Sequence, residues 1–230
     1  MHVTPYEKKD LMLLVPLYEH PADCPEYWER LIRAAGRLHS VVLNPASGPG
    51  EAPDERFAAV AERLRGAGVP VLGYADTDYG RRPHAAVVQD LLRYRDWYAT
   101  DGTFLDQAAA GPEFLPHYRR LAVAARAAGA RTVVLNHGVH PHPEYAELAD
   151  LLVTFEGPWD AYRDAAVPPW TADHPAQRFC HLVYAVPPGA PAAELAERLA
   201  AQRGAGVHCA VPGTGAHPWG TLPYALEATG

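Results

Sequence analysis

Two acidic residues stand where an apolar segment of the chain ends: Asp106 closes Gly102–Asp106 and Glu156 closes Leu151–Glu156. An unpaired carboxylate at the end of a buried strand is costly, so each needs water, a partner or a catalytic role. Two carboxyl groups facing one cleft can hydrolyse a glycosidic bond, one as nucleophile or base and the other as acid. The competing structural interpretation is that each caps the next helix or pairs with an arginine.

Further polar and aromatic side chains end similar apolar segments, and we expect them to line the same site. The candidates for substrate binding are Tyr18, Asn44, Tyr74, Asp78, Gln107, Asn136 and Tyr184. Each asparagine offers an acceptor and a donor to sugar hydroxyls or to the nucleophile. Aromatic rings commonly line small-molecule pockets, although a single ring of this kind more often anchors a loop.

Eight short apolar runs, alternating with polar loops and helical patterns, would position these residues. The runs cover 11–17, 41–44, 69–74, 102–106, 132–136, 151–156, 179–185 and 206–210. Helical spacing is seen from about 25 to 38, around 57–64, from 83 to 92, 113–128 and 190–202, with a short tail helix near Pro223. This alternation implies parallel βαβ units, and eight of them predict a single (β/α)8 TIM barrel over residues 1–230. An open doubly wound sheet is the alternative. In such barrels the chemistry lies at the C-terminal ends of the strands.

The composition excludes several classes of protein. The chain has 230 residues, 48% of them hydrophobic, and a net charge of −7, which argues against disorder and against nucleic-acid binding. No apolar run approaches the roughly 18–20 residues of a membrane span. The cysteines (Cys24, Cys180 and Cys209) lack the spacing of a disulfide framework or a zinc site, so we expect no metal and no cofactor. The N-terminus shows no signal peptide, which predicts a cytoplasmic protein as written, or a secreted one if the chain is trimmed.

Several motifs carry a resemblance to a known family. They are Leu14–Tyr18, Val42–Gly50, Leu72–Pro83 and Asp101–Asp106, with looser matches at 133–136, 154–156 and 218–223. With these motifs the chain resembles the spherulation-specific family 4 (spherulin-4-like) proteins. The resemblance implies a (β/α)8 barrel and, as in characterised relatives, retaining, endo-acting hydrolysis of α-1,4-linked galactosamine or N-acetylgalactosamine polymers. It implies that Asp106 is the nucleophile and Glu156 the general acid/base.

The chain departs from the family pattern at one position. Fungal relatives that act on acetylated polymer have Asp-Glu at the end of the fourth strand, whereas this chain has Asp106-Gln107. Gln107 can hydrogen-bond but cannot ionise. Either the polysaccharide or oligosaccharide substrate differs, and a cationic, de-acetylated amino sugar would suit, or the second acid comes only from Glu156. Glu19, Asp76, Asp78 and Asp101 would make the barrel mouth acidic, which favours a cationic sugar.

Two other functions compete with this interpretation. A metal-dependent hydrolase or deacetylase is suggested by His137, His140 and His142, although all three fall on one loop and no paired helical motif exists. A non-catalytic carbohydrate-binding barrel is the other alternative, because a fold does not fix a function. The replacement at Gln107 keeps this second alternative open.

Overall fold

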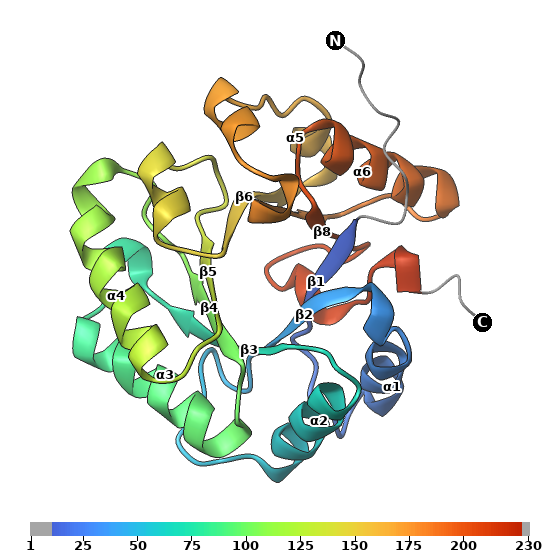
Figure 1. Cartoon of the computed structure of the whole chain (residues 1–230). Helices are drawn as coiled ribbons and strands as arrows, with labels where there is room; N and C mark the ends of the chain where they lie inside the picture. Colours follow the sequence, from blue (N-terminus) through green and yellow to red (C-terminus); the bar gives the residue numbers. More distant parts are fainter. Residues whose placement is uncertain (1–10, 227–230) are drawn as a thin grey trace.

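The computed structural model describes residues 11–226 and places eight parallel strands in a closed barrel (Figure 1). The strands are β1 (Met12–Pro16), β2 (Leu38–Leu43), β3 (Val71–Asp76), β4 (Gly102–Asp106), β5 (Thr132–Asn136), β6 (Leu151–Pro158), β7 (Phe179–Tyr184) and β8 (Val207–Ala210). Each strand pairs with the next along the chain, and β8 returns to β1 through Leu13 and His208. The predicted (β/α)8 barrel is confirmed, and the open sheet is wrong.

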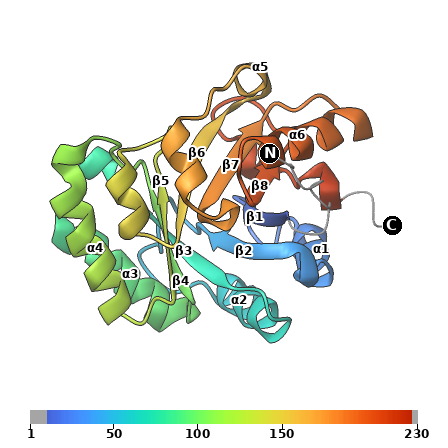
Figure 2. The same cartoon turned by 45° about the horizontal axis from the view of Figure 1, so that its top comes forward.

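Helices surround the barrel on its outer side (Figures 1 and 2). They are α1 (Pro25–Arg33), α2 (Glu55–Gly66), α3 (His84–Tyr98), α4 (Leu115–Ala127), α5 (Trp159–Arg163) and α6 (Ala190–Gln202). The residues at the start of some of these helices determine where the helices begin. Asp54 caps α2 by accepting hydrogen bonds from two backbone N–H groups of its first turn, and α1 begins with a proline, whose missing N–H costs nothing there.

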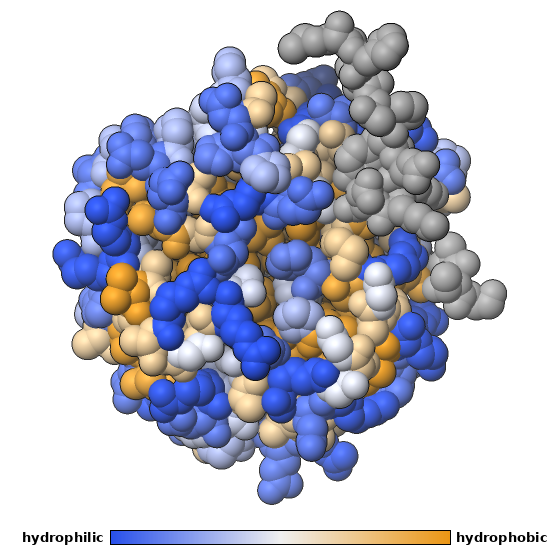
Figure 3. Space-filling model, in the orientation of Figure 1, coloured by the Kyte–Doolittle hydropathy of each residue, from blue (hydrophilic) through white to orange (hydrophobic). Residues whose placement is uncertain are grey.

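The strands are buried because helices cover them. Every residue of β8 is buried, and the buried side chains of β1 to β3 form one apolar cluster with α1 and α2. Burial on both faces explains why the strands appear in the sequence as continuous apolar runs rather than as alternating ones. The described residues 11–226 contain no helix with the length and apolar character needed to cross a membrane. The surface in Figure 3 mixes hydrophilic side chains with small apolar areas.

Some predicted boundaries were wrong. Leu38 was expected in the first helix but opens β2, where it pairs with Leu13 of β1. The third strand extends to Asp76 because its last residues continue the ladder with β4, which pairs Asp76 with Asp106. The chain between β5 and β6 contains only the 3-10 turn η4 (Pro143–Glu147), and the tail near Pro223 is also a 3-10 turn, η8 (Tyr224–Leu226).

Candidate active site

The two carboxylates selected from the sequence lie at the same end of the barrel, on strands separated by one neighbour. Asp106 is the last residue of β4, Glu156 lies near the end of β6, and Asn136 ends the intervening β5. Parallel strands bring their C-terminal ends to one mouth, so three residues far apart in sequence become neighbours. All three are partly or fully buried.

One amide group joins the two carboxylates. Nδ2 of Asn136 donates to Oδ1 of Asp106 at 2.6 Å and also to Oε2 of Glu156. The orientation of the amide is fixed from its other side, because the backbone N–H of Gly138 donates to Asn136 Oδ1 at 3.1 Å. Since both bonds start from one nitrogen and neither exceeds 2.6 Å, the two acceptor oxygens lie within about 5 Å of each other.

Asp106 receives two further hydrogen bonds. The hydroxyl of Tyr74 donates to its Oδ2 at 2.8 Å, and the backbone N–H of Gln107 also donates to the carboxylate. Burial raises the pKa of Asp106, whereas the three donors lower it, and the negative charge of Asp76 on the neighbouring strand raises it. The Tyr74 hydroxyl keeps its proton as donor, since burial and the adjacent carboxylate raise the pKa of Tyr74.

Glu156 lies in a less stabilising environment. Apart from Asn136 its carboxylate accepts from the indole Nε1–H of Trp219, at 3.2 Å. Burial first, and then the charge of Asp106, raise the pKa of Glu156 to about 6, although both donors lower it. The site therefore holds one carboxyl group that accepts from three donors and a second, with two donors, whose pKa is raised to about 6. Such a pair can divide the roles of ionised and protonated carboxyl between its members.

A buried threonine fixes the turn that follows Asp106. The hydroxyl of Thr77 lies 2.9 Å from the carbonyl oxygens of both Asp106 and Gln107, and 2.9 Å from the hydroxyl of Tyr118. Gln107 adopts a left-handed conformation with φ of 49°, which is uncommon for a non-glycine residue. The Tyr118 hydroxyl in turn accepts from the N–H of Ala109. These contacts hold the backbone that presents Asp106.

Three further predicted residues lie around this centre. Tyr18 packs edge-on against Tyr74 with ring centroids 6.0 Å apart, and Asn44 hydrogen-bonds to the Tyr18 hydroxyl. Burial and the charges of Asp106 and Glu156 raise the pKa of Tyr18, which places it within their electrostatic field. Tyr184 contacts the centre indirectly, through an edge-on packing with Trp219 at 6.1 Å.

Two predicted acidic residues do not contact the carboxylate pair. Asp78 pairs with Arg81 at 2.5 Å on the surface, where its side chain is 45% exposed, and its backbone N–H donates to the carboxylate of Asp76 at 2.7 Å. Among residues 11–226 it forms no hydrogen bond or ion pair with Asp106 or Glu156. Asp101 was expected at the barrel mouth, and this is wrong. It precedes β4, and its carboxylate accepts from the N–H of Val71 at the start of β3, which is the opposite end of the barrel.

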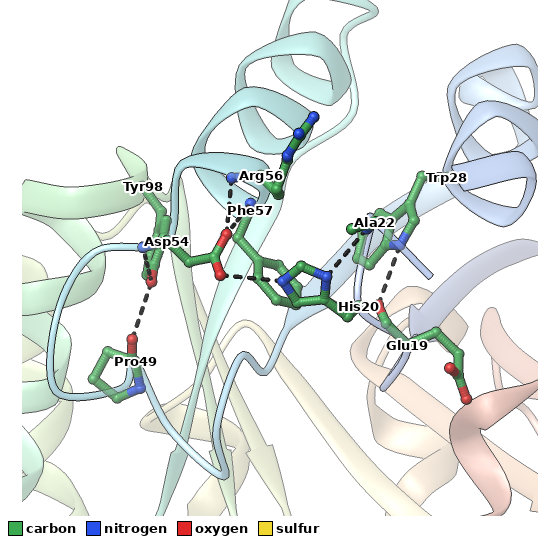
Figure 4. A network of polar contacts seen from close by, with 9 residues as sticks. All are labelled: Glu19, His20, Ala22, Trp28, Pro49, Asp54, Arg56, Phe57 and Tyr98. Atoms are coloured by element: carbon green, nitrogen blue, oxygen red, sulfur yellow. Dashed lines mark hydrogen bonds and ion pairs between the residues drawn. The ribbon is translucent and has the colours of Figure 1, made fainter. Parts of the chain in front are cut away.

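The loops after β1 and β2 are tied together beside the mouth (Figure 4). Nε2 of His20 lies 3.1 Å from the carboxylate of Asp54, and Nδ1 of His20 accepts from the N–H of Ala22. The Tyr98 hydroxyl bridges the Asp54 N–H and the Pro49 carbonyl. This network fixes the β1–α1 loop. The same loop carries Tyr18, which packs against Tyr74 in the candidate site.

The histidines of the β5–β6 loop do not converge on one point. The His137 ring is buried against Tyr145 and bonded to the Ala108 carbonyl, and burial lowers its pKa to about 4. His140 packs toward His181, whereas Nδ1 of His142 accepts from a backbone N–H of η4. Within residues 11–226 no cluster of three or more His, Cys, Asp or Glu side chains could hold a metal ion.

The sequence interpretation missed the role of Trp219. It is absent from the substrate-binding residues expected from the sequence, yet it is the side chain that donates to Glu156, and its carbonyl accepts from the Tyr18 N–H at 3.0 Å. A signal was available, since Trp219 belongs to the 218–223 segment that carried part of the family resemblance. Periodicity could not show it, because the residue follows β8 in a 3-10 turn (Pro218–Gly220).

A family model and a protein of known name place this chain in the same family. The model of "Spherulation-specific family 4" matches residues 12–227. The chain is 31% identical over 161 residues to Spherulin-4 of Physarum polycephalum, an alignment that covers 68% of this chain and 48% of that protein. The chain thus spans about half the length of this curated relative.

Solved structures show the same fold. The crystal structure of Aspergillus clavatus Sph3 in complex with GalNAc has a TM-score of 0.83 and 21% identity, covering 96% of each chain. A class V chitinase from Pseudomonas fluorescens has a TM-score of 0.51 and 11% identity, covering 76% of this chain and 68% of the chitinase. At these identities the likeness establishes the barrel, and the chemistry rests on the site itself.

Proposed function

The chain belongs to spherulation-specific family 4, and from this membership and the geometry of its carboxylate pair we propose that it is a retaining glycoside hydrolase. The observation that carries the proposal is the single amide of Asn136, which binds both Asp106 and Glu156 at the barrel mouth. Retaining glycosidases hold their two carboxyl groups about 5–5.5 Å apart, whereas inverting ones need about 6.5–9.5 Å. The bound of about 5 Å between the acceptor oxygens supports retention.

The environments of the two groups support a division of roles. Asp106, with donors from Tyr74, Asn136 and its own turn, is the ionised nucleophile that attacks the anomeric carbon. Glu156, whose pKa is raised to about 6, protonates the leaving oxygen and then deprotonates the water that releases the sugar. When Asp106 becomes a neutral ester in the intermediate, the repulsion that raised the Glu156 pKa disappears, which favours its switch from acid to base.

The substrate that we propose is an α-1,4-linked polymer of galactosamine or N-acetylgalactosamine, cleaved internally. The family resemblance and the GalNAc bound to Aspergillus clavatus Sph3 support an amino-sugar substrate. Asp76, beside Asp106, and Glu19, near Gly220, are acidic residues around the mouth, whereas Asp78 is paired with Arg81 and Asp101 lies at the opposite end of the barrel. A cationic, de-acetylated sugar is favoured by acidic residues there.

Turnover of defined oligosaccharides tests this proposal. The wild type, Asp106→Asn and Glu156→Gln are incubated with acetylated and de-acetylated α-1,4-linked galactosamine oligomers, and products are separated by chromatography. We expect internal cleavage by the wild type, preference for the de-acetylated oligomers, and loss of turnover in both variants with the fold retained by circular dichroism. Preference for the acetylated oligomers would exclude the cationic substrate, and undiminished turnover in either variant would exclude the catalytic pair.

The second candidate is a non-catalytic carbohydrate-binding barrel, which the replacement of a family carboxylate by Gln107 favours. This candidate predicts that the wild type binds the oligosaccharides but releases no product over days. The proposed hydrolase predicts that binding persists in Asp106→Asn while product formation does not. The same incubation therefore separates the two functions.

A further inference from the structure

The turn at residues 106–109, which follows the proposed nucleophile, is tied to neighbouring elements at each of its four residues. Two carbonyls of the turn accept from the chain that follows β3, and two N–H groups donate to β5 and α4. The bonds are Thr77 N–H to Asp106 O at 3.0 Å, Tyr79 N–H to Gln107 O at 2.8 Å, Ala108 N–H to Asn136 O at 2.7 Å, and Ala109 N–H to the Tyr118 hydroxyl at 2.8 Å. Of these four, the last alone ends on a side chain, and α4, which carries it, lies outside the barrel (Figure 1).

The hydroxyl of Tyr118 lies in the middle of a buried chain of hydrogen bonds. It is 2.9 Å from Oγ1 of Thr77, which lies 2.9 Å from the carbonyl oxygens of both Asp106 and Gln107. Tyr118 and Thr77 are both 0% exposed, so solvent does not compete for these bonds. A backbone N–H can only donate and a carbonyl can only accept. The chain therefore runs from the Ala109 N–H through the Tyr118 and Thr77 hydroxyls to the carbonyls at the start of the turn.

The residue enclosed by this chain has a strained backbone. Gln107 has a φ of 49°, and a non-glycine residue keeps such a left-handed conformation only where its surroundings hold it. Burial raises the pKa of Asp106, whereas the Gln107 N–H, which donates to the carboxylate in this conformation, lowers it. The bonds that hold the turn thus also hold a donor to the proposed nucleophile.

We propose that Tyr118 is a positioning residue for the nucleophile, which acts through Thr77 on the peptide groups that present the Asp106 carboxylate. This role rests on the proposed function of Asp106. Among residues 11–226 the Tyr118 hydroxyl has hydrogen bonds only with Thr77 and Ala109, so it acts on the reaction through the backbone that it holds. Since a misplacement of about 1 Å can cost about 100-fold in rate, such a remote contact is able to control turnover.

The groups that set the charge of Asp106 directly are separate from Tyr118. The titratable side chains facing the carboxylate come from β3, β6 and the loop after β1, and they are Tyr74, Asp76, Glu156 and Tyr18. Within the described part of the chain none of them is hydrogen-bonded to Tyr118. A change in the titration of Asp106 after substitution of Tyr118 therefore reports on the turn.

Tyr118→Phe tests the proposal, because it removes the hydroxyl and keeps the ring. On the galactosamine oligomers we expect kcat to fall about 10- to 100-fold with KM nearly unchanged. The acidic limb of the pH profile should move upward by about half to one pH unit, and carbon NMR of the Asp106 carboxyl without substrate should show the same rise in its pKa. Thr77→Val should have the same effects, whereas Thr77→Ser, which keeps the hydroxyl, should retain the wild-type values. Since both hydroxyls belong to one chain, the double variant should be no worse than the more impaired single variant.

The matched control is Tyr145→Phe. Tyr145 is also 0% exposed, its ring centroid lies 5.8 Å from that of Tyr118, and its hydroxyl donates at 2.9 Å to the carbonyl of Gly111 in the same loop. We expect this variant to lose stability as Tyr118→Phe does, but to keep the wild-type kcat and the wild-type titration of Asp106. Equal changes in the two variants would overturn the positioning role, as would independent losses that multiply in the double variant.

The two readouts separate this proposal from the proposed hydrolysis. If the wild type cleaves the oligomers and Tyr118→Phe does so with the same kcat and pH profile, the positioning role is wrong and the hydrolase remains. If the wild type releases no product, the titration of the Asp106 carboxyl decides. An unchanged pKa in Tyr118→Phe then overturns the coupling through Thr77, and a raised pKa supports it without any turnover.

Discussion

The hydrogen bond from Tyr74 to Asp106 permits a test of the proposed nucleophile that leaves both carboxylates in place. Tyr74→Phe removes only the hydroxyl that donates to Oδ2 at 2.8 Å. A hydrogen bond to a charged group contributes about 1.5–3 kcal/mol, and 1.36 kcal/mol corresponds to one pKa unit. Because this donor stabilises the ionised form, we expect its loss to raise the pKa of Asp106 by about one to two units.

The consequence is measured in the pH dependence of kcat/KM. An ionised nucleophile is lost as the pH falls through its pKa, so the acidic limb of the profile should move upward by about one to two pH units. At the optimum we expect kcat/KM to fall about 10- to 100-fold, since the same donor also orients the attacking oxygen. The basic limb, which reports Glu156, should move little.

The protein contains a matched control for this substitution. Tyr94 is also a buried tyrosine, at 1% exposure, but its hydroxyl has no hydrogen-bond partner among the described residues. Tyr94→Phe should therefore leave the pH profile unchanged and the free energy of unfolding equal or higher. An acidic limb that stays in place in Tyr74→Phe, or moves equally in Tyr94→Phe, would refute the assignment of Asp106 as an ionised nucleophile supported by Tyr74.

Three further outcomes follow from the contacts of the site and its loops. Trp219→Phe removes a donor to Glu156 and should raise its pKa above about 6, so the basic limb of the pH–rate profile should move upward, and a downward move would contradict the geometry. Because the folded-state pKa of Glu156 is raised from 4.5 to about 6, the contribution of Glu156 to the free energy of unfolding should be fully present below pH 4.5 and decrease by about 2 kcal/mol as the pH rises through about 6. Thermal unfolding should show a smaller decline in Glu156→Gln, and equal declines would oppose the raised pKa. Asp54→Ala removes the cap of α2 and the His20 contact and should lower the free energy of unfolding by about 1–2 kcal/mol in urea titrations, whereas an unchanged midpoint would show that the cap contributes nothing.

The barrel could be predicted because its strands are buried on both faces. A run such as Leu151–Val153 is apolar throughout, and this pattern can be recognised without knowing which residues pack against the strand. The end of β3 was harder to place, since Asp76 is polar and joins the strand only through its pairing with Asp106. Leu38 fits a helical stripe by spacing, and only the contact with Leu13 assigns it to β2.

The candidate site was accessible for a related reason. Asp106, Asn136 and Glu156 each interrupt an apolar run at its C-terminal end, and the barrel topology then brings such ends together. The spacing along the chain contains no information on which side chains share a proton or an amide, so the bridge made by Asn136 had to come from the structure. Trp219 lies 63 residues after Glu156 in the sequence, and the closure of the barrel brings its indole N–H to the carboxylate. Asp78 forms an ion pair on the surface with Arg81, which follows it by three residues in the sequence.

The stereochemistry of cleavage shows whether Asp106 and Glu156 act as a retaining pair. Time-resolved NMR of an α-1,4-linked galactosamine oligomer during hydrolysis identifies the anomer of the first product before it equilibrates. Two carboxyl groups bridged by one amide are closer together than the about 6.5–9.5 Å that an inverting mechanism requires, so we expect the α-anomer to appear first. Initial release of the β-anomer would show inversion and contradict the roles assigned to Asp106 and Glu156.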